Sequence, residues 1–424
     1  MVIEYIRSGL QLGGLDGVLT ELYGNKGLER QKNRYLEAIN GLQARFSLDD
    51  GTEAAFYSAP GRAEISGNHT DHQRGRVLAA AIDADIICAA VKNERVELVA
   101  ESYGEVFFDV PANSGGLCAQ GTPQSLAEGV FDYFLMSGYE VGGFRAFIMS
   151  DVREGSGLSS SAAFANLIGT VLNHEYNGGR VPPLDIAKAS RHAENVFFGK
   201  PCGLMDQAAS SHGGFVFIDF GHKEPVIESI PFRPDEYGLA LCVVHTGGSH
   251  AGLTDEYAAI TLDMRGVAAA LGGEVLGFCD SAVFYGEIIS LREKLGDRAV
   301  LRAHHFFNET ARVEKQAGML KNKDLEGFLQ LVNESGRSSI AYLQNTHAAS
   351  MPENQPISLA LALAERGLSG KGAFRVHGGG FAGTILAFVP IEIYDHFEDT
   401  LNTAFGADSC HRLSVRQSGA VRVI

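Results

Sequence analysis

The chain has 424 residues, 45% of them hydrophobic, which is enough to bury a large core spread over more than one domain. Its 51 acidic and 35 basic residues give a formal net charge of -16, and such a surface disfavours nucleic acid and anionic membranes as partners. A small anion can still bind, because local N–H groups and a few cations set the field at a site.

The six cysteines are far apart and form no CxxC pair, which is typical of reduced, buried thiols in a cytosolic protein. The first residues, MVIEYIRSGLQLGG, carry an early Glu4 and no long apolar run, unlike a signal peptide. No uncharged apolar stretch approaches the length that spans a membrane. We expect a cytoplasmic protein that is a monomer or a weak homodimer.

Residues 1–50 are predicted to be helical and amphipathic. Tyr35, Ile39 and Leu42 recur at three- and four-residue steps, a spacing that places them on one face for packing. A strand is expected next in EAAFYSA, closed by Pro60.

Polar side chains are concentrated between two apolar runs in residues 61–82, GRAEISGNHTDHQRGRVLAAAI. Short polar groups at that density cannot all face a core without partners. The segment is either an ordinary polar loop or the lining of a sugar pocket, in which carboxylate, amide and imidazole groups satisfy hydroxyls. The polar residues are Arg62, Glu64, Asn68, His69, Asp71 and His72.

The middle of the chain alternates strand-like and helical stretches. Strands are expected within residues 83–110 and in RAFIMSDV, and a helix over residues 124–137. RAFIMSDV leads into EGSGLSSSAA (residues 154–163), which a helix-like run, AFANLIGTVLNHEY, follows directly.

The EGSGLSSSAA loop predicts a phosphate site. Its glycines allow the backbone to approach a ligand, and the following helix start offers unpaired N–H groups and a partial positive charge. Ser159, Ser160 and Ser161 can add hydroxyl donors, and one of them can turn an oxygen toward Mg²⁺. The loop is neither a Walker A sequence nor the dinucleotide fingerprint, and alone it could be a flexible loop with a serine N-cap.

Residues 185–211, DIAKASRHAENVFFGKPCGLMDQAASS, predict a helix of small residues that ends near Gly199 and a new helix around Asp206. An aspartate in a first turn is favoured by the helix dipole alone, or it is aimed at a substrate hydroxyl. Strands are expected over residues 213–220 and 239–246, with the domain switch between them.

Two stretches stand out in the C-terminal third. Residues 301–320 predict a helix. GAFRVHGGGFAGTILAFV (residues 372–389) places four glycines between two strand-like runs, which would suit a hairpin turn.

Four of these segments, in this order, resemble the motifs of galactokinases in the GHMP kinase superfamily. GRAEISGNHTDH is similar to the signature Gly-Arg-Val-Asn-Leu-Ile-Gly-Glu-His-Thr-Asp-Tyr, and EGSGLSSSAA resembles the nucleotide loop. HAENVFFGKPCGLMDQ resembles Ala-Glu-Asn…Cys-Gly-Ile-Met-Asp-Gln. VHGGGFAG resembles the glycine-rich third motif, with His377 in place of the usual threonine. The resemblance covers roughly residues 30–424.

The resemblance implies an α+β, two-domain GHMP kinase fold with the active site in the cleft between the domains. An N-terminal domain like ribosomal protein S5 domain 2 is expected over residues 1–235, with about 1–28 as an atypical extension. A ferredoxin-like domain is expected over residues 236–424. The implied activity is that of an ATP-dependent sugar 1-kinase, which uses ATP and Mg²⁺ and has small-molecule partners.

The resemblance also implies roles for residues at the matching positions. Asp206 would be the catalytic carboxylate, while Arg62 would stabilise negative charge and hold Asp206 ionised. Mg²⁺ would be held by Ser161 and Glu194. The implied ATP-binding residues are Gly155, Ser156, Gly157, Leu158, Ser159, Ser160 and Ser161, and the implied sugar-binding residues are Asn68, His69, Asp71, Gly203 and Tyr257.

Galactose is the expected substrate, with galactose 1-phosphate as the product. However, the signature's usual glutamate and tyrosine are Asn68 and His72 here. A carboxylate at C6 of the sugar would be repelled by glutamate and tolerated by asparagine. The HTDHQ stretch also resembles plant galacturonic acid kinases. Galacturonate and then arabinose are therefore alternative sugars, and a catalytically inactive sugar sensor is the alternative class.

Overall fold

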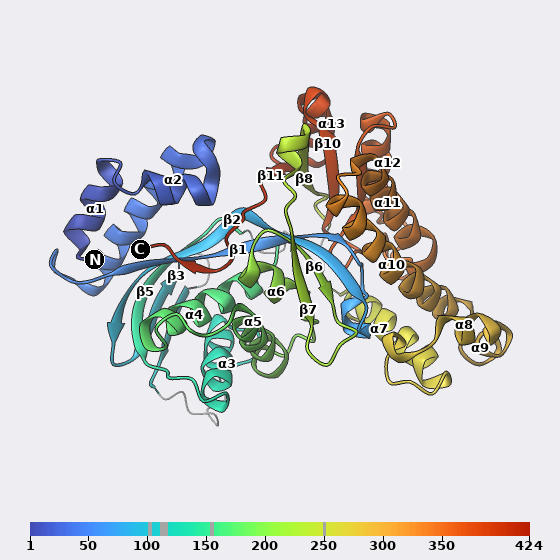
Figure 1. The fold of residues 1–424 in the computed structure, drawn as a ribbon, viewed down its shortest axis with the longest axis horizontal. Coiled ribbons are helices and arrows are strands. Elements are labelled where there is room, and N and C mark those ends of the chain that lie inside the picture. The colour runs from blue at the N-terminus through green and yellow to red at the C-terminus, as the bar shows by residue number, and fades with distance from the viewer. Residues whose placement is uncertain (101–103, 111–117, 153–156, 249–251) are drawn as a thin grey trace.

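The computed structural model describes residues 1–100, 104–110, 118–152, 157–248 and 252–424. These residues form a larger mixed sheet and a smaller antiparallel sheet, each covered by helices (Figure 1). The expected α+β class is confirmed.

The larger sheet has eight strands in the described part of the chain, in the order β12-β1-β2-β5-β3-β4, with β6 paired to β2 and β7 to β6. It is antiparallel except where β3 runs parallel to β5. One long strand, β2, pairs with β5 along one half and with β6 along the other. The strands are β1 (Ala55–Ser66), β2 (Arg76–Asn93), β3 (Val96–Ala100), β4 (Gly104–Phe108), β5 (Gly143–Ser150), β6 (Phe215–Asp219), β7 (Val226–Ile230) and β12 (Val421–Arg422).

Helices cover both faces of this sheet because side chains alternate along its strands. In β2, Ile87 and Ala89 pack with α2, whereas Ile86 and Cys88 face the helices of the opposite layer. The helices of the two layers are α1 (Ile3–Gln11) and α2 (Asp16–Phe46) on one side, and α3 (Pro123–Met136), α4 (Ser160–Tyr176), α5 (Pro183–His192) and α6 (Met205–His212) on the other.

The smaller sheet has the order β11-β8-β10-β9. In β10, Ile385 and Ala387 face α12 and α13, whereas Leu386 and Phe388 join the core that the sheet shares with the larger one through α10 and α11. The elements are β8 (Leu239–His245), β9 (Ala373–His377), β10 (Thr384–Pro390), β11 (Cys410–Leu413), α7 (Thr254–Ala270), α8 (Ser281–Gly286), α9 (Ile288–Leu295), α10 (Asp297–Lys321), α11 (Leu325–Ser338), α12 (Pro356–Leu368) and α13 (Tyr394–Phe405).

The last strand, β12, returns to the larger sheet and pairs with β1. A buried ion cluster fixes this return. The Asp85 carboxylate in β2 lies 2.6 Å from Nη1 of Arg34 in α2 and 2.9 Å from Nη1 of Arg416 near the C-terminus. Tyr23 also donates a 2.6 Å hydrogen bond to it. The division of the chain near residue 235 stays a prediction.

Most elements expected from the sequence are present. Two of them differ in form, and several further elements were not expected, among them β7, α8, α9, α11, α12 and α13. The N-terminal helical region is two helices, and α2 is interrupted at Gly24, whose φ of 71° is incompatible with a helix. The strand β7 was not expected, because its residues are largely exposed and lack an apolar run. The helix after residue 183 ends in a π-helical turn, η2 (Ala193–Phe198).

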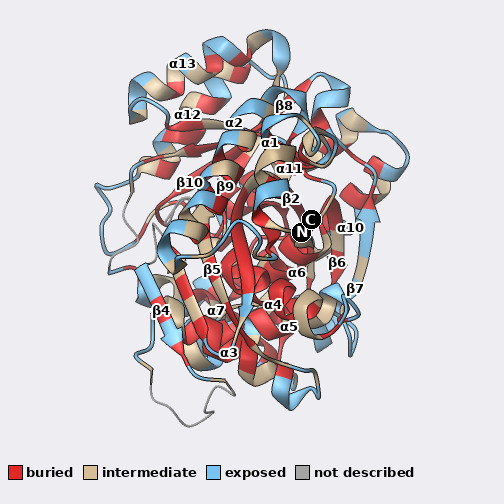
Figure 2. Ribbon diagram, turned by 90° about the vertical axis from the view of Figure 1, so that its left-hand side faces the viewer, coloured by how far each residue is buried: buried red, intermediate tan, exposed pale blue. Residues whose placement is uncertain are grey.

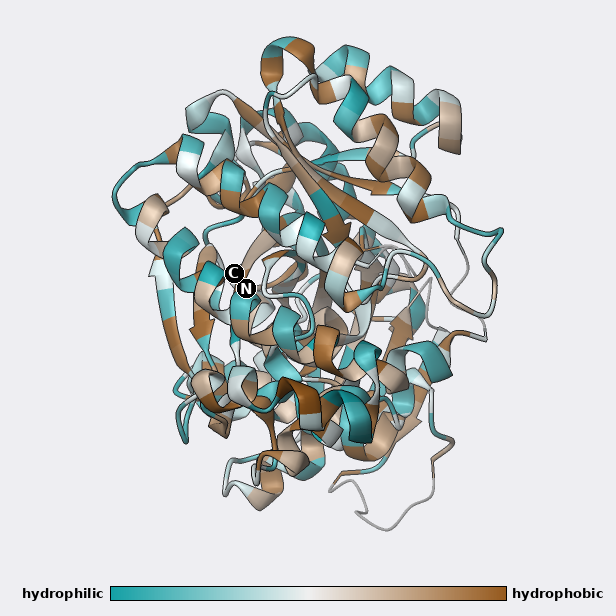
Figure 3. Ribbon diagram, turned by 90° about the vertical axis from the view of Figure 1, so that its right-hand side faces the viewer, coloured by the Kyte–Doolittle hydropathy of each residue, from teal (hydrophilic) through white to brown (hydrophobic). Residues whose placement is uncertain are grey.

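Buried residues concentrate in the central strands and in α4 and α6, whereas β4 is largely exposed and α13 buries one face through Tyr394, Phe397 and Leu401 (Figure 2). The helices that face the viewer in Figure 3 each carry both hydrophobic and hydrophilic residues. Among the residues described, we find no helix that is both long and apolar enough for a transmembrane span.

Candidate active site

Strand β1 presents polar residues to the interior of the molecule. Its pairing with β2 shifts register between Pro60 and Arg62 and again beyond Glu64, so the segment between the shifts is re-aimed by bulges. Within it, Ala63 and Ile65 join the main core. Arg62 and Glu64 alternate with them and line a cavity on the other face.

A bidentate ion pair joins Arg62 to Asp206, which lies in the first turn of α6. Nε and Nη2 of the guanidinium each lie 2.8 Å from one carboxylate oxygen. Ser159 donates a further 2.5 Å hydrogen bond to Oδ2 of Asp206. Burial raises the pKa of Asp206, but the charge of Arg62 and these hydrogen bonds outweigh burial, so the pKa lies below its usual range.

The serine loop meets this ion pair. The Nη1 group of Arg62 donates to the carbonyl of Gly157, and helix α4 begins at Ser160, three residues earlier than the apolar run indicates. Ser160 and Ser161 therefore lie in the first turn, where backbone N–H groups have no helical partner. Gly157 has a φ of 71°, and a Cβ there would lie 2.8 Å from Oγ1 of Thr384.

The predicted phosphate loop also included Gly155, Ser156 and Leu158. Gly155 and Ser156 lie outside the described residues. Leu158 lines a separate cavity beside α2, although its carbonyl accepts a 3.1 Å hydrogen bond from the backbone N–H of Arg62.

Glu194 lies behind Ser161 and is buried. The π-helical turn η2 adds one residue to the helix and aims this carboxylate at the start of α4; such turns are frequent at functional sites. Ser161 and Gln207 donate to Glu194, and Cys202 lies 3.1 Å from it. The structure therefore places the two expected Mg²⁺ ligands in contact.

His69, Asp71 and His72 follow β1 and, together with Gly203, line the cavity beside Arg62. Asp71 packs directly against Gly203. A Cβ at position 203 would overlap with Oδ2 of Asp71. Oδ1 of Asp71 accepts a 2.8 Å hydrogen bond from the backbone N–H of His72.

The two histidines are neutral in this wall. Burial is the main cause that lowers the pKa of His69 to about 4 and that of His72 to about 3. Nε2 of His69 lies 3.0 Å from the carbonyl of Gly379, so this nitrogen carries the proton and Nδ1 is free to accept from His72 at 3.4 Å. Burial, with Asp206 as a second cause, raises the pKa of Asp71 to about 7.

The glycine-rich segment after β9 closes the site from the smaller sheet. Tyr257 of α7 donates a 2.8 Å hydrogen bond to the carbonyl of Gly380, and a Cβ at Gly379 would lie 2.6 Å from its ring. His377 accepts a 3.0 Å hydrogen bond from the backbone N–H of Glu64 through Nε2. This contact fixes β9 against β1.

Two adjoining cavities of ≈ 610 and ≈ 170 Å³ result, with walls from both sheets and their helices. They share Arg62, Asp206, the two histidines, Gly378 and Gly379. Most of the expected site residues line one or both cavities: Arg62, Asn68, His69, Asp71, Gly157, Ser159, Ser160, Ser161, Gly203, Asp206 and Tyr257.

Two charged residues of these cavities were not among the expected site residues. Lys200 lines the larger cavity and lies 3.7 Å from Glu194. Lys200 lies in the sequence between Glu194 and Asp206, and this position could have indicated that it lines the same cavity. Glu64 lines the smaller cavity. It belongs to the polar residues of segment 61–82 that could line a sugar pocket, but the family resemblance implies no role for it.

Comparisons with known proteins agree with this geometry. Residues 125–214 match the family model described as GHMP kinases N terminal domain, and residues 44–92 match the galactokinase galactose-binding signature. A galactokinase of Thermococcus kodakarensis is 30% identical over 335 residues, which are 78% of this chain and 88% of that protein. A human galactokinase is 29% identical over 398 residues, covering 91% and 96% of the two chains.

Solved structures show the same fold. The galactokinase of Lactococcus lactis, solved with galactose, superposes with a TM-score of 0.76 at 22% identity and covers 91% of this chain and 99% of its own. A mevalonate kinase from L. major superposes with a TM-score of 0.57, covering 87% of this chain and 97% of its own. The two-domain GHMP kinase fold is thereby confirmed, and the chain belongs to the galactokinase family of the GHMP kinase superfamily.

Proposed function

We propose that this protein transfers the γ-phosphoryl group of ATP to the anomeric hydroxyl of galactose. The contact that carries the proposal is the Arg62–Asp206 ion pair, which Ser159 joins to the first turn of α4. It places a carboxylate and a guanidinium between the sugar cavity and the phosphate loop. The relatives named galactokinase support the choice of reaction.

Phosphoryl transfer needs positioning and charge neutralisation more than covalent work by the protein. Asp206, with its lowered pKa, is ionised and would orient the sugar hydroxyl or take its proton. Arg62 would stabilise the charge that develops on the transferred group, because its third nitrogen already faces the loop at Gly157.

The ATP phosphates would lie on residues 155–161 and the start of α4, where oriented N–H groups favour an anion. Ser161 and Glu194 offer the hard oxygen donors that suit Mg²⁺, which is usually held by one or two carboxylates together with substrate phosphates. When bound, Mg²⁺ would neutralise charge on the phosphate oxygens. Lys200 would add a positive charge to the same cavity.

The sugar would occupy the smaller cavity. His69, Asp71, Asn68 and Gly203 form its wall. Tyr257 lines the adjoining larger cavity and packs against Gly379, which belongs to both cavities, so it would border the sugar from that side. We retain the predicted boundary near residue 235, a cytoplasmic location and a monomer or weak homodimer as parts of the proposal. The unpaired state of the six cysteines supports a reducing compartment.

Galactose is favoured over galacturonate by one specific contact. The neutral Asn68 would have allowed an anionic sugar, but its Nδ2 lies 2.8 Å from the carboxylate of Glu64. The cavity therefore keeps a carboxylate beside Asn68, and a uronate would face it. Arabinose remains a second candidate as a neutral sugar. The intact set of Arg62, Ser161, Glu194 and Asp206 argues against an inactive sensor.

The purified protein should be assayed for ADP formation with Mg²⁺, ATP and a panel of galactose, galacturonate, arabinose and N-acetylgalactosamine. The proposal predicts the highest kcat/KM with galactose. Tight sugar binding without ADP from any sugar would favour the sensor instead.

A further inference from the structure

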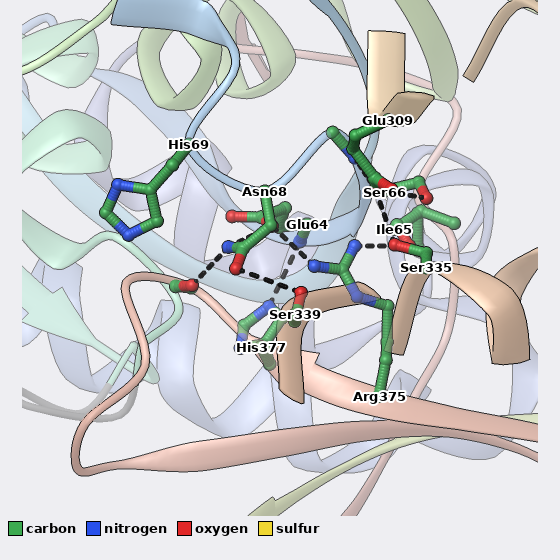
Figure 4. A network of polar contacts seen from close by, with 12 residues as sticks. Glu64, Ile65, Ser66, Asn68, His69, Glu309, Ser335, Ser339, Arg375 and His377 are labelled. Carbon is green, nitrogen blue, oxygen red and sulfur yellow. Dashed lines mark hydrogen bonds and ion pairs between the residues drawn. The ribbon is translucent and has the colours of Figure 1, made fainter. Parts of the chain in front are cut away.

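The side chain of Asn68 is buried, with 1% of its surface exposed, and its amide is fully bonded to the protein (Figure 4). Nδ2 donates to the carbonyl of Gly378 at 2.6 Å and to Oε1 of Glu64 at 2.8 Å. Oδ1 accepts from Nδ2 of Asn345 at 2.7 Å and from Ser339 at 3.4 Å. A carbonyl and a carboxylate only accept, so they must face the NH₂ group, and both of its hydrogens are used.

Glu64 is held by the same network but keeps one oxygen uncommitted. Nη2 of Arg375 lies 3.0 Å from Oε1, the oxygen that also accepts from Asn68. No other described residue donates to Oε2, and Glu64 lines the sugar cavity. A second nitrogen of Arg375 donates to the carbonyl of Ile65 at 2.9 Å, which fixes the guanidinium and thereby the orientation of the carboxylate (Figure 4).

We propose that Glu64 is a specificity-determining residue of this enzyme, whose Oε2 accepts a hydrogen bond from a hydroxyl of a neutral sugar, and that Asn68 is a positioning residue for Glu64. This inference rests on the proposed sugar kinase function. Asn68 then contributes through the protein network, while Glu64 provides the acceptor that the sugar meets.

The charge of the cavity defines the class of ligand. Three carboxylates line it, on Glu64, Asp71 and Asp206, and Arg62 is the one arginine among the described lining residues. Arg62 is committed to Asp206, and Arg375 behind the wall is committed to Glu64. A sugar that carries its own carboxylate would add a further acidic group beside these three, whereas hydroxyl groups can donate to each acceptor.

Glu64→Gln tests the contact with little change of shape. Asn68 and Arg375 both donate to the same oxygen, so the amide must turn its carbonyl toward them and its NH₂ group toward the cavity. The acceptor for the sugar thereby becomes a donor. A hydrogen bond to a charged group is strong enough that we expect galactose affinity to fall about tenfold or more.

The decisive measurement is calorimetric binding of galactose and its single-position deoxy analogues, without nucleotide, to wild type and Glu64→Gln. In the wild type, the analogue that lacks the contacted hydroxyl should bind about tenfold or more weakly than galactose. In Glu64→Gln, the difference in affinity between galactose and this one analogue (the deoxy penalty at that position) should nearly disappear. The deoxy penalties at the other positions should remain. Glu64→Asp withdraws the oxygen by one methylene, and serves as a second variant if the glutamine variant fails to fold.

Glu309→Gln is the matched control, because Glu309 is a buried carboxylate of the same region that bonds Ser66, Ser335 and Arg312 and is absent from the described lining of the cavity. It should lower thermal stability and leave the pattern of deoxy penalties unchanged.

If Glu64→Gln retains every deoxy penalty while the wild type phosphorylates galactose, Glu64 does not contact the sugar and the inference is wrong. A different outcome is that the wild type forms no ADP, although it binds galactose and Glu64→Gln removes one deoxy penalty. The inference then holds for sugar binding, and the proposed kinase function fails.

Discussion

The guanidinium of Arg62 and the carboxylate of Asp206 meet side by side, through two parallel hydrogen bonds of 2.8 Å. The remaining nitrogen of Arg62 faces the carbonyl of Gly157. One side chain thus connects the carboxylate of the sugar cavity with the loop at the start of α4. These hydrogen bonds orient the guanidinium toward both groups, and such orientation is what an electrostatic contribution to catalysis requires.

Arg62→Ala should lower kcat more than it raises KM for galactose, because the charge of Arg62 would matter mainly when charge develops in the transition state. Steady-state kinetics with both substrates varied would separate the two effects. Arg62→Lys keeps the charge but cannot form the bidentate pair, so we expect only partial recovery. A raised KM with unchanged kcat would identify Arg62 as a ground-state contact alone.

Glu194→Gln should raise the Mg²⁺ concentration needed for half-maximal rate by about tenfold or more, the usual scale for disturbing a metal site. Ser161 donates to Oε1 of Glu194 and Gln207 to Oε2. Glutamine keeps one acceptor oxygen for Gln207, and its NH₂ group can donate to the hydroxyl of Ser161, so the start of α4 should stay in place. Calorimetric titration of Mg²⁺ into the protein with ADP gives a readout independent of turnover. An unchanged Mg²⁺ requirement would remove Glu194 from the metal site.

The pH dependence of stability should report the ionisation of Asp71. Burial raises the pKa of Asp71 to about 7, against 3.8 as its ordinary value. Between these values the folded protein binds more protons at this site than the unfolded chain, so ionisation of Asp71 costs stability as the pH rises. Asp71→Asn does not ionise and should gain Tm relative to wild type from pH 4 to pH 7.

His69 and His72 titrate in both proteins, so their contribution largely cancels in this comparison. Their lowered pKa values have the opposite sign: they remove stability as the pH falls below about 6.5, the ordinary value for histidine. A Tm difference between Asp71→Asn and wild type that stays constant from pH 4 to pH 8 would contradict the raised pKa of Asp71.

Asp85→Ala should destabilise the fold by about 3–5 kcal/mol, because it leaves the buried guanidinium groups of Arg34 and Arg416 without their shared carboxylate. Denaturant unfolding would measure the loss. Asp85 is not among the described residues that line the sugar cavity, so the residual folded protein should keep its KM for galactose. A loss below about 1 kcal/mol, the scale of an exposed ion pair, would show that the cluster contributes little.

The sequence predicted the elements and the meeting of the main motifs well, for identifiable reasons. Strands such as β5 and helices such as α4 have clear periodicity, and the motifs that contain Arg62, Ser159 and Asp206 resemble those of one family. The structure then places these three side chains within hydrogen-bond distance. Their chemical roles stay predictions until the variants are measured.

The rest depended on contacts between residues far apart in the chain. The partners of the Asn68 amide include Ser339 and Asn345, which lie 271 and 277 residues away, so its full hydrogen bonding could not be foreseen. The π-helical turn at Glu194 is likewise invisible in the residue pattern. The interpretation of Asn68 as a neutral substitution also missed Glu64, whose carboxylate lies beside it.

The most direct test of the central claim is the turnover of Asp206→Asn, measured together with calorimetric binding of galactose and ATP. Asparagine preserves the size of the side chain but cannot act as a base. The account predicts that kcat falls at least ~10²-fold, while both ligands still bind and the Tm shows a folded protein. Wild-type turnover in this variant would contradict the assignment of Asp206 and the mechanism built on it.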